Sequence, residues 1–243
     1  MGLLAVQMAQ EGVGGPRDIL ECEGGVFKAT AGKYNPSKLE PNPGRDYEIA
    51  KVYMKPYVGC RLNHGAIDCL LYLKQKYDID SRNVEQIEIE TADIMELVSG
   101  FHPTSTTNIV EHSVSLPYMS AVAIVHGYPW PEALSDHRML DPLVYEVAKK
   151  IKFKSDPELS KSYPAKLSTR VTVLTKNGKK YLHEEDNPKG DPSSPLTDED
   201  LKEKFLTFSL DILSEQKATD TVEKVFHIDE IDDVSTIMHN LRP

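Results

Sequence analysis

Two segments rich in proline and glycine divide this sequence and limit the folds open to it. The first extends from Pro36 to Gly44 and the second from Asn187 to Pro192. Both residue types interrupt regular secondary structure, so each segment is expected to connect two separately folded parts. We therefore predict three consecutive regions, residues 1–46, 47–186 and 187–243.

The two outer regions show helical patterns only. Residues 2–11 form an apolar run whose side chains would cover almost every face of a helix, and such a helix is expected to be buried on all sides. Thr197 and Asp200 have the spacing of a capping box at the start of a further helix. From there to Arg242 the pattern predicts three helices and no strand.

The middle region mixes strand and helix patterns. Residues 84–90 alternate apolar and polar side chains, which predicts a half-exposed strand. Asn177 and Gly178 between two apolar runs predict a hairpin with a type I′ turn. The expected elements are strands at 47–54, 84–90, 167–175 and 179–185, and helices at 63–77, 94–98, 115–126 and 142–150. We therefore predict an α+β fold whose middle region is inserted into a helical domain.

Composition excludes several classes of partner and site. The net charge of −10 over 243 residues argues against nucleic acid or an anionic membrane surface as the main partner. No apolar run reaches the roughly 20 residues of a membrane span, and residues 1–10 lack the basic start of a secretory signal. The three cysteines are Cys22, Cys60 and Cys69, without CxxC spacing, and no HxxxH or HExxH occurs, so we expect no metal. A cytoplasmic protein is expected, or a mitochondrial matrix protein in a eukaryote.

Three runs of sequence together resemble one enzyme family. Lys55 to Asp68 (KPYVGCRLNHGAID) is similar to a KPYPSCxxxHxAID segment, and Glu111 to Tyr118 (EHSVSLPY) is similar to AQFSLPYxxA. Pro188 to Phe205 (PKGDPSSPLTDEDLKEKF) is similar to PKGDPxNPLSxxELxxKF. In this order and spacing, the runs resemble the C-terminal half of the MmgE/PrpD family over essentially the whole chain.

The resemblance implies a fold, an activity and partners. Members of the family have a large all-helical domain, incomplete in this chain, with a smaller α+β lid inserted in it, and usually form homodimers. They remove water or carbon dioxide from small di- and tricarboxylates, or isomerise them, and no cofactor is expected here. We therefore expect a small polycarboxylate substrate, and either a homodimer or a complex with a chain that supplies the N-terminal half.

The expected chemistry needs a base beside a carboxylate, an acid for the leaving hydroxyl, and cations that hold the other carboxylates. Lys55 follows a predicted strand and precedes a proline, and the resemblance favours a substrate-binding or catalytic role over that of a solvated surface lysine. His64, nine residues later, suits proton transfer because the pKa of histidine lies near neutrality. A helix-capping or core role for His64 is the alternative.

Three further residues complete the predicted site. Arg61 could clamp a carboxylate with two hydrogen bonds, although a surface ion pair is its alternative. Cys60 occupies a place that can be histidine in decarboxylase members, which argues against decarboxylation, and a buried inert thiol is the favoured interpretation. Tyr118 resembles the family's active-site tyrosine, with an ordinary half-buried tyrosine as the alternative. His112 would not share a face with Tyr118 on a continuous helix.

The leading hypothesis is a lyase that eliminates water from a 2-methylcitrate-like substrate. An epimerase or isomerase acting on a compound such as iminodisuccinate comes next, followed by a cis-aconitate decarboxylase. A different class of explanation is an inactive half-enzyme, or a subunit that needs a separate N-terminal half.

Overall fold

The structure, a computed structural model, describes residues 1–31, 33–35, 47–104, 108–135 and 139–242. It divides into two compact units, Met1–Tyr47 and Glu48–Pro243, and each is described by itself. The predicted proline-rich loop at 36–44 lies outside the described residues. The predicted boundary between residues 186 and 187 falls inside the second unit and stays a prediction.

The first unit contains two helices, α1 (Gly2–Gln10) and α2 (Val26–Thr30). Gly12, at φ +88°, follows the end of α1, and its amide donates to the Ala9 carbonyl at 3.1 Å. The helix is therefore where the apolar run predicts it. No residue of α1 is buried within this single chain, and the cover that its apolar faces are expected to need stays a prediction.

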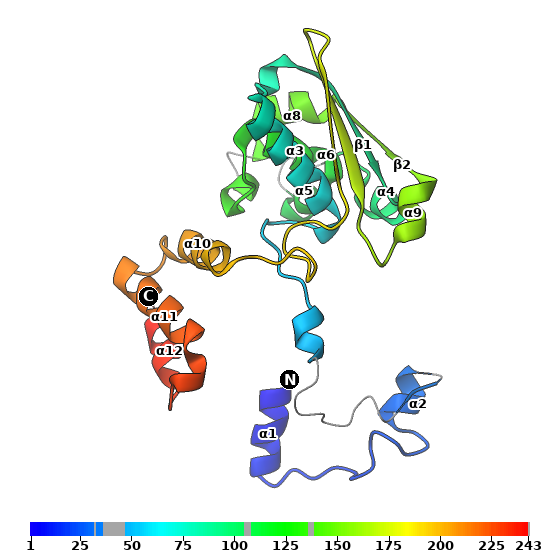
Figure 1. Ribbon diagram of the computed structural model, residues 1–243. Coiled ribbons are helices and arrows are strands. Elements are labelled where there is room, and N and C mark those ends of the chain that lie inside the picture. The colour runs from blue at the N-terminus through cyan, green and yellow to red at the C-terminus, as the bar shows by residue number, and fades with distance from the viewer. Residues whose placement is uncertain (32, 36–46, 105–107, 136–138, 243) are drawn as a thin grey trace. The chain divides into compact units, whose positions relative to one another are not determined.

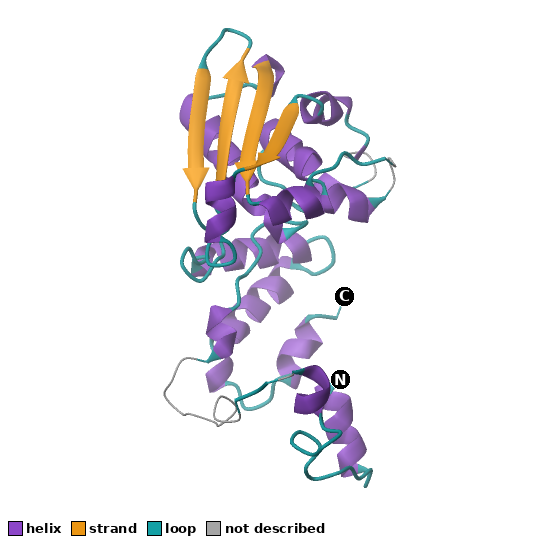
Figure 2. Ribbon diagram, turned by 90° about the vertical axis from the view of Figure 1, so that its right-hand side faces the viewer, coloured by secondary structure: helices purple, strands orange, loops and turns teal. Residues whose placement is uncertain are grey.

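The second unit contains a four-stranded mixed sheet in the order β2-β1-β3-β4 (Figures 1 and 2). Its strands are β1 (Val84–Thr91), β2 (Ile151–Ser155), β3 (Thr169–Thr175) and β4 (Lys180–Glu185). β1 pairs with β2 in parallel and with β3 in antiparallel fashion, with Ile87 opposite both Ile151 and Val173. The α+β class is confirmed. β2 was not predicted, because its alternation of Ile151 and Phe153 with lysines extends over only five residues.

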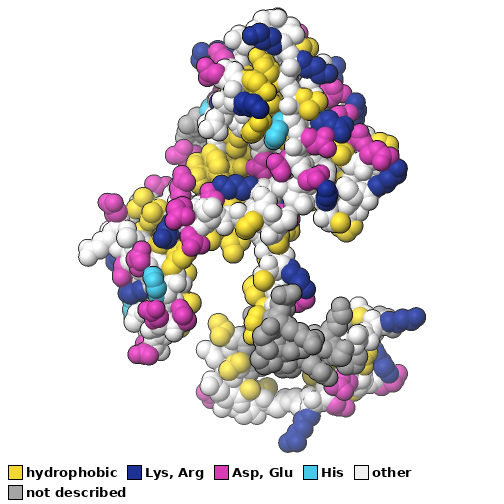
Figure 3. All heavy atoms as spheres, in the orientation of Figure 1, with side chains coloured by type: hydrophobic (Ala, Val, Ile, Leu, Met, Phe, Trp, Pro, Cys, Tyr) yellow, Lys and Arg dark blue, Asp and Glu magenta, His cyan; other side chains and the backbone are white. Residues whose placement is uncertain are grey.

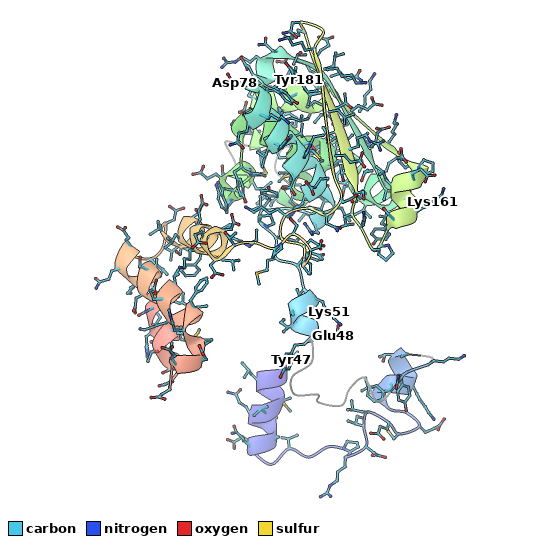
Figure 4. All side chains as sticks on the ribbon, viewed as in Figure 1. Tyr47, Glu48, Lys51, Asp78, Lys161 and Tyr181 are labelled. Atoms are coloured by element: carbon cyan, nitrogen blue, oxygen red, sulfur yellow. The ribbon has the colours of Figure 1, made fainter. Side chains whose placement is uncertain are left out.

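Helices cover one face of this sheet and bury the core against it (Figure 1). The main ones are α3 (His64–Tyr77), α6 (Leu116–His126) and α8 (Pro142–Ala148). Asp78, at φ +49°, ends α3, and Tyr77 packs on Tyr181 of β4 with ring centroids 4.5 Å apart; Figure 4 labels Asp78 and Tyr181 at this end of the sheet. The smaller helices are α4 (Asp93–Ser99), α5 (Ile109–Val114) and α9 (Pro157–Ser162).

Two predicted elements take other conformations. At 47–54 a 3₁₀ helix, η2 (Glu48–Lys51), replaces the expected strand, and the exposed segment after it meets the protein through the Met54 amide, which donates to the Gly190 carbonyl at 2.8 Å. Aromatic and β-branched side chains favour a strand only where a sheet edge is available to pair with. The hairpin turn is also not type I′, because that turn needs two residues with positive φ and only Gly178 has one, at +81°. The Gly178 amide donates to Thr175, which gives a three-residue loop.

The C-terminal segment is helical, as predicted. It consists of α10 (Asp198–Ser209), α11 (Glu215–Phe226) and α12 (Ser235–Asn240), with a short 3₁₀ turn between the last two. Thr197 and Asp200 form the predicted capping box. A groove of about 460 Å³ between α10 and α11 is lined mainly by apolar side chains, including Leu201, Phe205 and Phe226. In the part of the chain that the structure describes, no helix is both long and apolar enough to span a membrane.

Candidate functional site

The turn at Lys55–Cys60 leads through a short 3₁₀ helix, η3 (Arg61–Asn63), into α3, and α5 holds it in place. The Lys55 side chain is exposed, and its Nζ donates to the Gly59 carbonyl at 3.0 Å. Gly59 has φ +96°, and a Cβ there would lie 2.5 Å from the Ser113 carbonyl oxygen, so only glycine fits. The Cys60 amide donates to that same oxygen at 2.9 Å. The turn is therefore a fixed platform that presents the Lys55 amine to solvent.

His64 is the first residue of α3 and is fully buried. Its ring packs edge-on against Tyr57, with centroids 5.1 Å apart. Both ring nitrogens are buried, and neither has a hydrogen-bond partner among the described residues. Burial, followed by the positive charges of Arg61, Lys55 and Lys204, lowers the pKa of His64 to about 3. The imidazole is therefore neutral at physiological pH, with one nitrogen able to accept and the other to donate a hydrogen bond.

Arg61 is buried and makes its contacts with the protein. One terminal nitrogen donates to the Lys189 carbonyl and the other to the Pro188 carbonyl, both at 3.2 Å. Asp191 lies 3.5 Å from the second of these, and the guanidinium stacks over the Tyr53 ring at 4.5 Å. Arg61 therefore fixes the loop that follows β4. A carboxylate clamp by this residue stays a prediction.

A buried carboxylate that the sequence analysis did not single out stabilises the same platform. The Tyr57 hydroxyl donates to one oxygen of Asp68, and the Lys189 amide donates to the other at 2.8 Å. Burial raises the pKa of Asp68, and hydrogen bonds from Tyr57 and Lys189 oppose that shift. Tyr57 and Asp68 both belong to the KPYVGCRLNHGAID run, so their places in that run were the available signal.

Lys204 of α10 is a second residue that the sequence analysis missed. Its Nζ donates to the backbone carbonyl of Lys55 at 2.7 Å and lies 5.9 Å from the centre of the Phe208 ring. Burial and the charge of Lys55 lower the pKa of Lys204. Its position in the run that ends at Phe205 was the only hint in the sequence.

Tyr118 lies in a different environment from Lys55 and His64. It is fully buried in α6, and its hydroxyl donates to the Ala133 carbonyl at 3.1 Å. Among the described residues, no hydrogen bond, ion pair or ring contact joins it to Lys55 or His64. The structure therefore brings together Lys55, Cys60, Arg61 and His64 but not Tyr118, whose catalytic role stays a prediction.

His112 and Tyr118 are neighbours, which the sequence analysis did not anticipate. Their rings meet edge to face, with centroids 4.5 Å apart. His112 Nδ1 lies 2.8 Å from the Asn108 carbonyl and Nε2 lies 2.6 Å from the Tyr145 hydroxyl. The contact arises because Ser115 takes an extended conformation between α5 and α6, so the two residues are not on one continuous helix. The Ser115 N-cap and the following Pro117 are the sequence signals for this break.

The remaining acidic and sulfur-containing groups do not gather into a metal site. Cys60 is half-buried, Cys69 is buried, and the cysteines are unpaired. Within the described ranges, no group of three or more His, Cys, Asp or Glu side chains is placed to hold a metal ion.

Two comparisons with known proteins bear on the family of the chain. Residues 57–228 match the family model described as the MmgE/PrpD C-terminal domain. The chain is also similar to cis-aconitate decarboxylase of Mus musculus, with 22% identity over 254 residues, covering 99% of this chain and 50% of that protein. The chain thus spans about half the length of the curated relative that it matches.

Proposed function

Because the chain belongs to the MmgE/PrpD family, we propose that it forms part of an enzyme that acts on small di- or tricarboxylates, with elimination of water from a 2-methylcitrate-like substrate as its leading reaction. The observation that carries the proposal is the pairing of Lys55 with His64. The Lys55 amine is exposed on the turn, and the His64 imidazole is buried at the start of α3 without a hydrogen-bond partner among the described residues. Neither group forms an ion pair with a described carboxylate.

The chemistry of an elimination explains why these groups suit it. A proton must leave the carbon next to a carboxylate, and negative charge then develops on that carboxylate. Lys55 supplies a fixed positive charge where it can stabilise the developing charge. The neutral His64 ring can accept a proton or a hydrogen bond, and an anionic substrate beside it would offset the cations that lower the pKa of His64.

Decarboxylation is the second candidate, and one specific observation favours it. The relative found by sequence comparison is named as a cis-aconitate decarboxylase. Loss of carbon dioxide also leaves negative charge next to a carboxylate, so the same cation would serve it. Against it stands Cys60, at the position where the resemblance allows histidine in decarboxylases. Epimerisation or isomerisation uses a related carbanion and is the third candidate.

We propose further that the active form contains more polypeptide than one copy of this chain, either as a homodimer or with a chain that supplies the N-terminal half. The support is the apolar groove between α10 and α11 together with exposed apolar side chains on the C-terminal helices. Figure 3 shows hydrophobic side chains at the surface of this segment among acidic and basic ones. Apolar surface of this kind is typical of an interaction site. An inactive half-enzyme is the alternative.

The test is a direct assay on three substrates. The purified chain, alone and with a candidate N-terminal half, is incubated with 2-methylcitrate, cis-aconitate and iminodisuccinate. We expect an unsaturated tricarboxylate from 2-methylcitrate. Carbon dioxide from cis-aconitate with no change in 2-methylcitrate would replace dehydration by decarboxylation. If none of the three is altered in either preparation, the proposed activity is wrong.

A further inference from the structure

Lys204 connects the C-terminal helices to the turn that carries Lys55. It is half-buried on α10, 149 residues after Lys55, and its amine donates to the carbonyl of Lys55 itself at 2.7 Å. The Lys55 amine is bound to the Gly59 carbonyl, four residues along the same turn. Two ammonium groups from distant parts of the sequence therefore lie at one short turn.

These two amines have no acidic partner among the described residues. The ion pairs of the neighbouring groups are made elsewhere, Lys189 with Asp200 at 2.5 Å and Arg61 with Asp191 at 3.5 Å. Among the described residues, the Lys55 amine contacts the Gly59 carbonyl. The Lys204 amine contacts the Lys55 carbonyl and lies over the Phe208 ring. Like charges held together without a counter-ion destabilise the folded chain, unless an anion from solution binds between them.

The nearby His64 imidazole is an independent observation that points to a ligand. His64 is fully buried, and both its ring nitrogens lack a hydrogen-bond partner among the described residues. Buried polar atoms are nearly always hydrogen-bonded in native proteins, so an unpartnered buried ring is expected to acquire a partner when a ligand binds. The charged side chains that act on this ring are Arg61, Lys55 and Lys204, all positive, and the Tyr57 ring packs against it.

We propose that Lys55 and Lys204 together form a binding site for one carboxylate arm of a small polycarboxylate, with His64 as an additional hydrogen-bonding group for that arm. This inference rests on the proposed function and adds Lys204 as a substrate-binding residue from the C-terminal helices. One carboxylate has two oxygens, and each ammonium donates a charge-assisted hydrogen bond to one of them. A bound anion would thereby tie α10 to the turn before α3.

The test uses tricarballylate, a tricarboxylate without a hydroxyl group, so no water can be eliminated and binding is measured apart from turnover. Its affinity for the full chain is measured by calorimetry for the unsubstituted protein and for Lys55→Met, Lys204→Met and Lys204→Arg. Lys202→Met is the matched control, because Lys202 lies on the same helix with its amine over the Phe226 ring at 4.9 Å. Circular dichroism confirms that each variant is folded.

We expect Lys204→Met and Lys55→Met each to weaken binding about tenfold or more, the effect of one lost charge-assisted hydrogen bond. Lys204→Arg is expected to retain most of the affinity, and Lys202→Met all of it. The pKa of His64, followed by NMR of its ring, is expected to rise when tricarballylate binds. Unchanged affinity in Lys204→Met, or no binding to the unsubstituted chain at millimolar ligand, overturns the inference. Binding as expected without turnover of any substrate would instead overturn the proposed activity alone.

Discussion

At the scale of single residues, the site contains two kinds of cationic side chain: one supports the fold, and the other is available to a ligand. Arg61 is buried and bound to the carbonyls of Pro188 and Lys189, so its loss would release a loop. Lys55 is exposed and donates one hydrogen bond to a backbone carbonyl of its own turn. His64 is buried like Arg61 but, among the described side chains, has no bonded partner. A buried polar ring with nothing to bind is a cost to the fold that a ligand can offset.

The low pKa of His64 makes a prediction about acid stability. The pKa of His64 is about 3 in the folded chain and near 6.5 in the unfolded chain. Between these pH values His64 is therefore protonated in the unfolded chain and neutral in the folded chain. Stability linked to neutral His64 is therefore complete above pH 6.5 and is lost as the pH falls from 6.5 towards 3. Linkage gives a loss of about 3 kcal/mol between pH 7 and pH 4. The free energy of unfolding of His64→Leu should fall less over this interval, as measured by urea titration.

The control for this experiment is His102→Leu, because His102 is exposed in a loop. It should follow the unsubstituted protein over the whole pH range. If the curve of His64→Leu also runs parallel to that of the unsubstituted protein, His64 does not have a depressed pKa in the folded chain.

At the scale of elements, the parts with local signals could be predicted and the parts set by distant partners could not. Thr197 and the alternation at 84–90 marked the starts of α10 and β1, because caps and periodicity act within a few residues. β2 was missed because its alternating run is only five residues long, and its pairing with β1 involves residues more than 60 positions away in the sequence. Residues 47–54 look like a strand, but no neighbouring strand pairs with them in the described structure.

The candidate site divides in the same way. Lys55, Cys60, Arg61 and His64 are close in sequence, so one run of residues predicted their proximity. Lys204 could not be placed by sequence reasoning, because its contact with residue 55 depends on how the C-terminal helices pack. The contact between the rings of His112 and Tyr118 depends on the extended conformation of Ser115, which lies between two helices.

Replacement of Gly190 tests how the loop after β4 is joined to the Lys55 turn. It has φ +88°, and a Cβ there would lie 1.9 Å from the Met54 carbonyl oxygen. Gly190→Ala should lower the free energy of unfolding by about 3 kcal/mol or more, from backbone strain and a disturbed Met54 to Gly190 hydrogen bond. Gly178→Ala is the matched control. It also has positive φ, at +81°, but open space around it, so about 1 kcal/mol is expected in chemical denaturation. Equal losses in the two variants would show that the close approach of Gly190 to Met54 is unimportant.

At the scale of the whole molecule, the structure shows the α+β class and the match to the family model shows the family, whereas the assembly stays a prediction. The chain corresponds to half the length of its relative, and its C-terminal helices carry an apolar groove. We predict a dimer or a complex with a further chain, measured by light scattering with size-exclusion chromatography. Phe226→Lys, at the edge of the groove, should reduce that assembly, with exposed Val110→Lys as a control on α5. A monodisperse monomer that binds no hydrophobic dye would contradict this prediction.

The central claim is that the Lys55 amine holds a substrate carboxylate, and the most direct test compares turnover with stability in one variant. In the preparation that converts a polycarboxylate, Lys55→Met should lower kcat/KM about 100-fold or more and change the free energy of unfolding by about 0.5 kcal/mol or less. Lys51→Met is the matched control, because Lys51 pairs with Glu48 on η2 at 2.6 Å (Figure 4) and should keep its activity. Full activity in Lys55→Met, or a loss of activity that only follows a loss of stability, would contradict the claim.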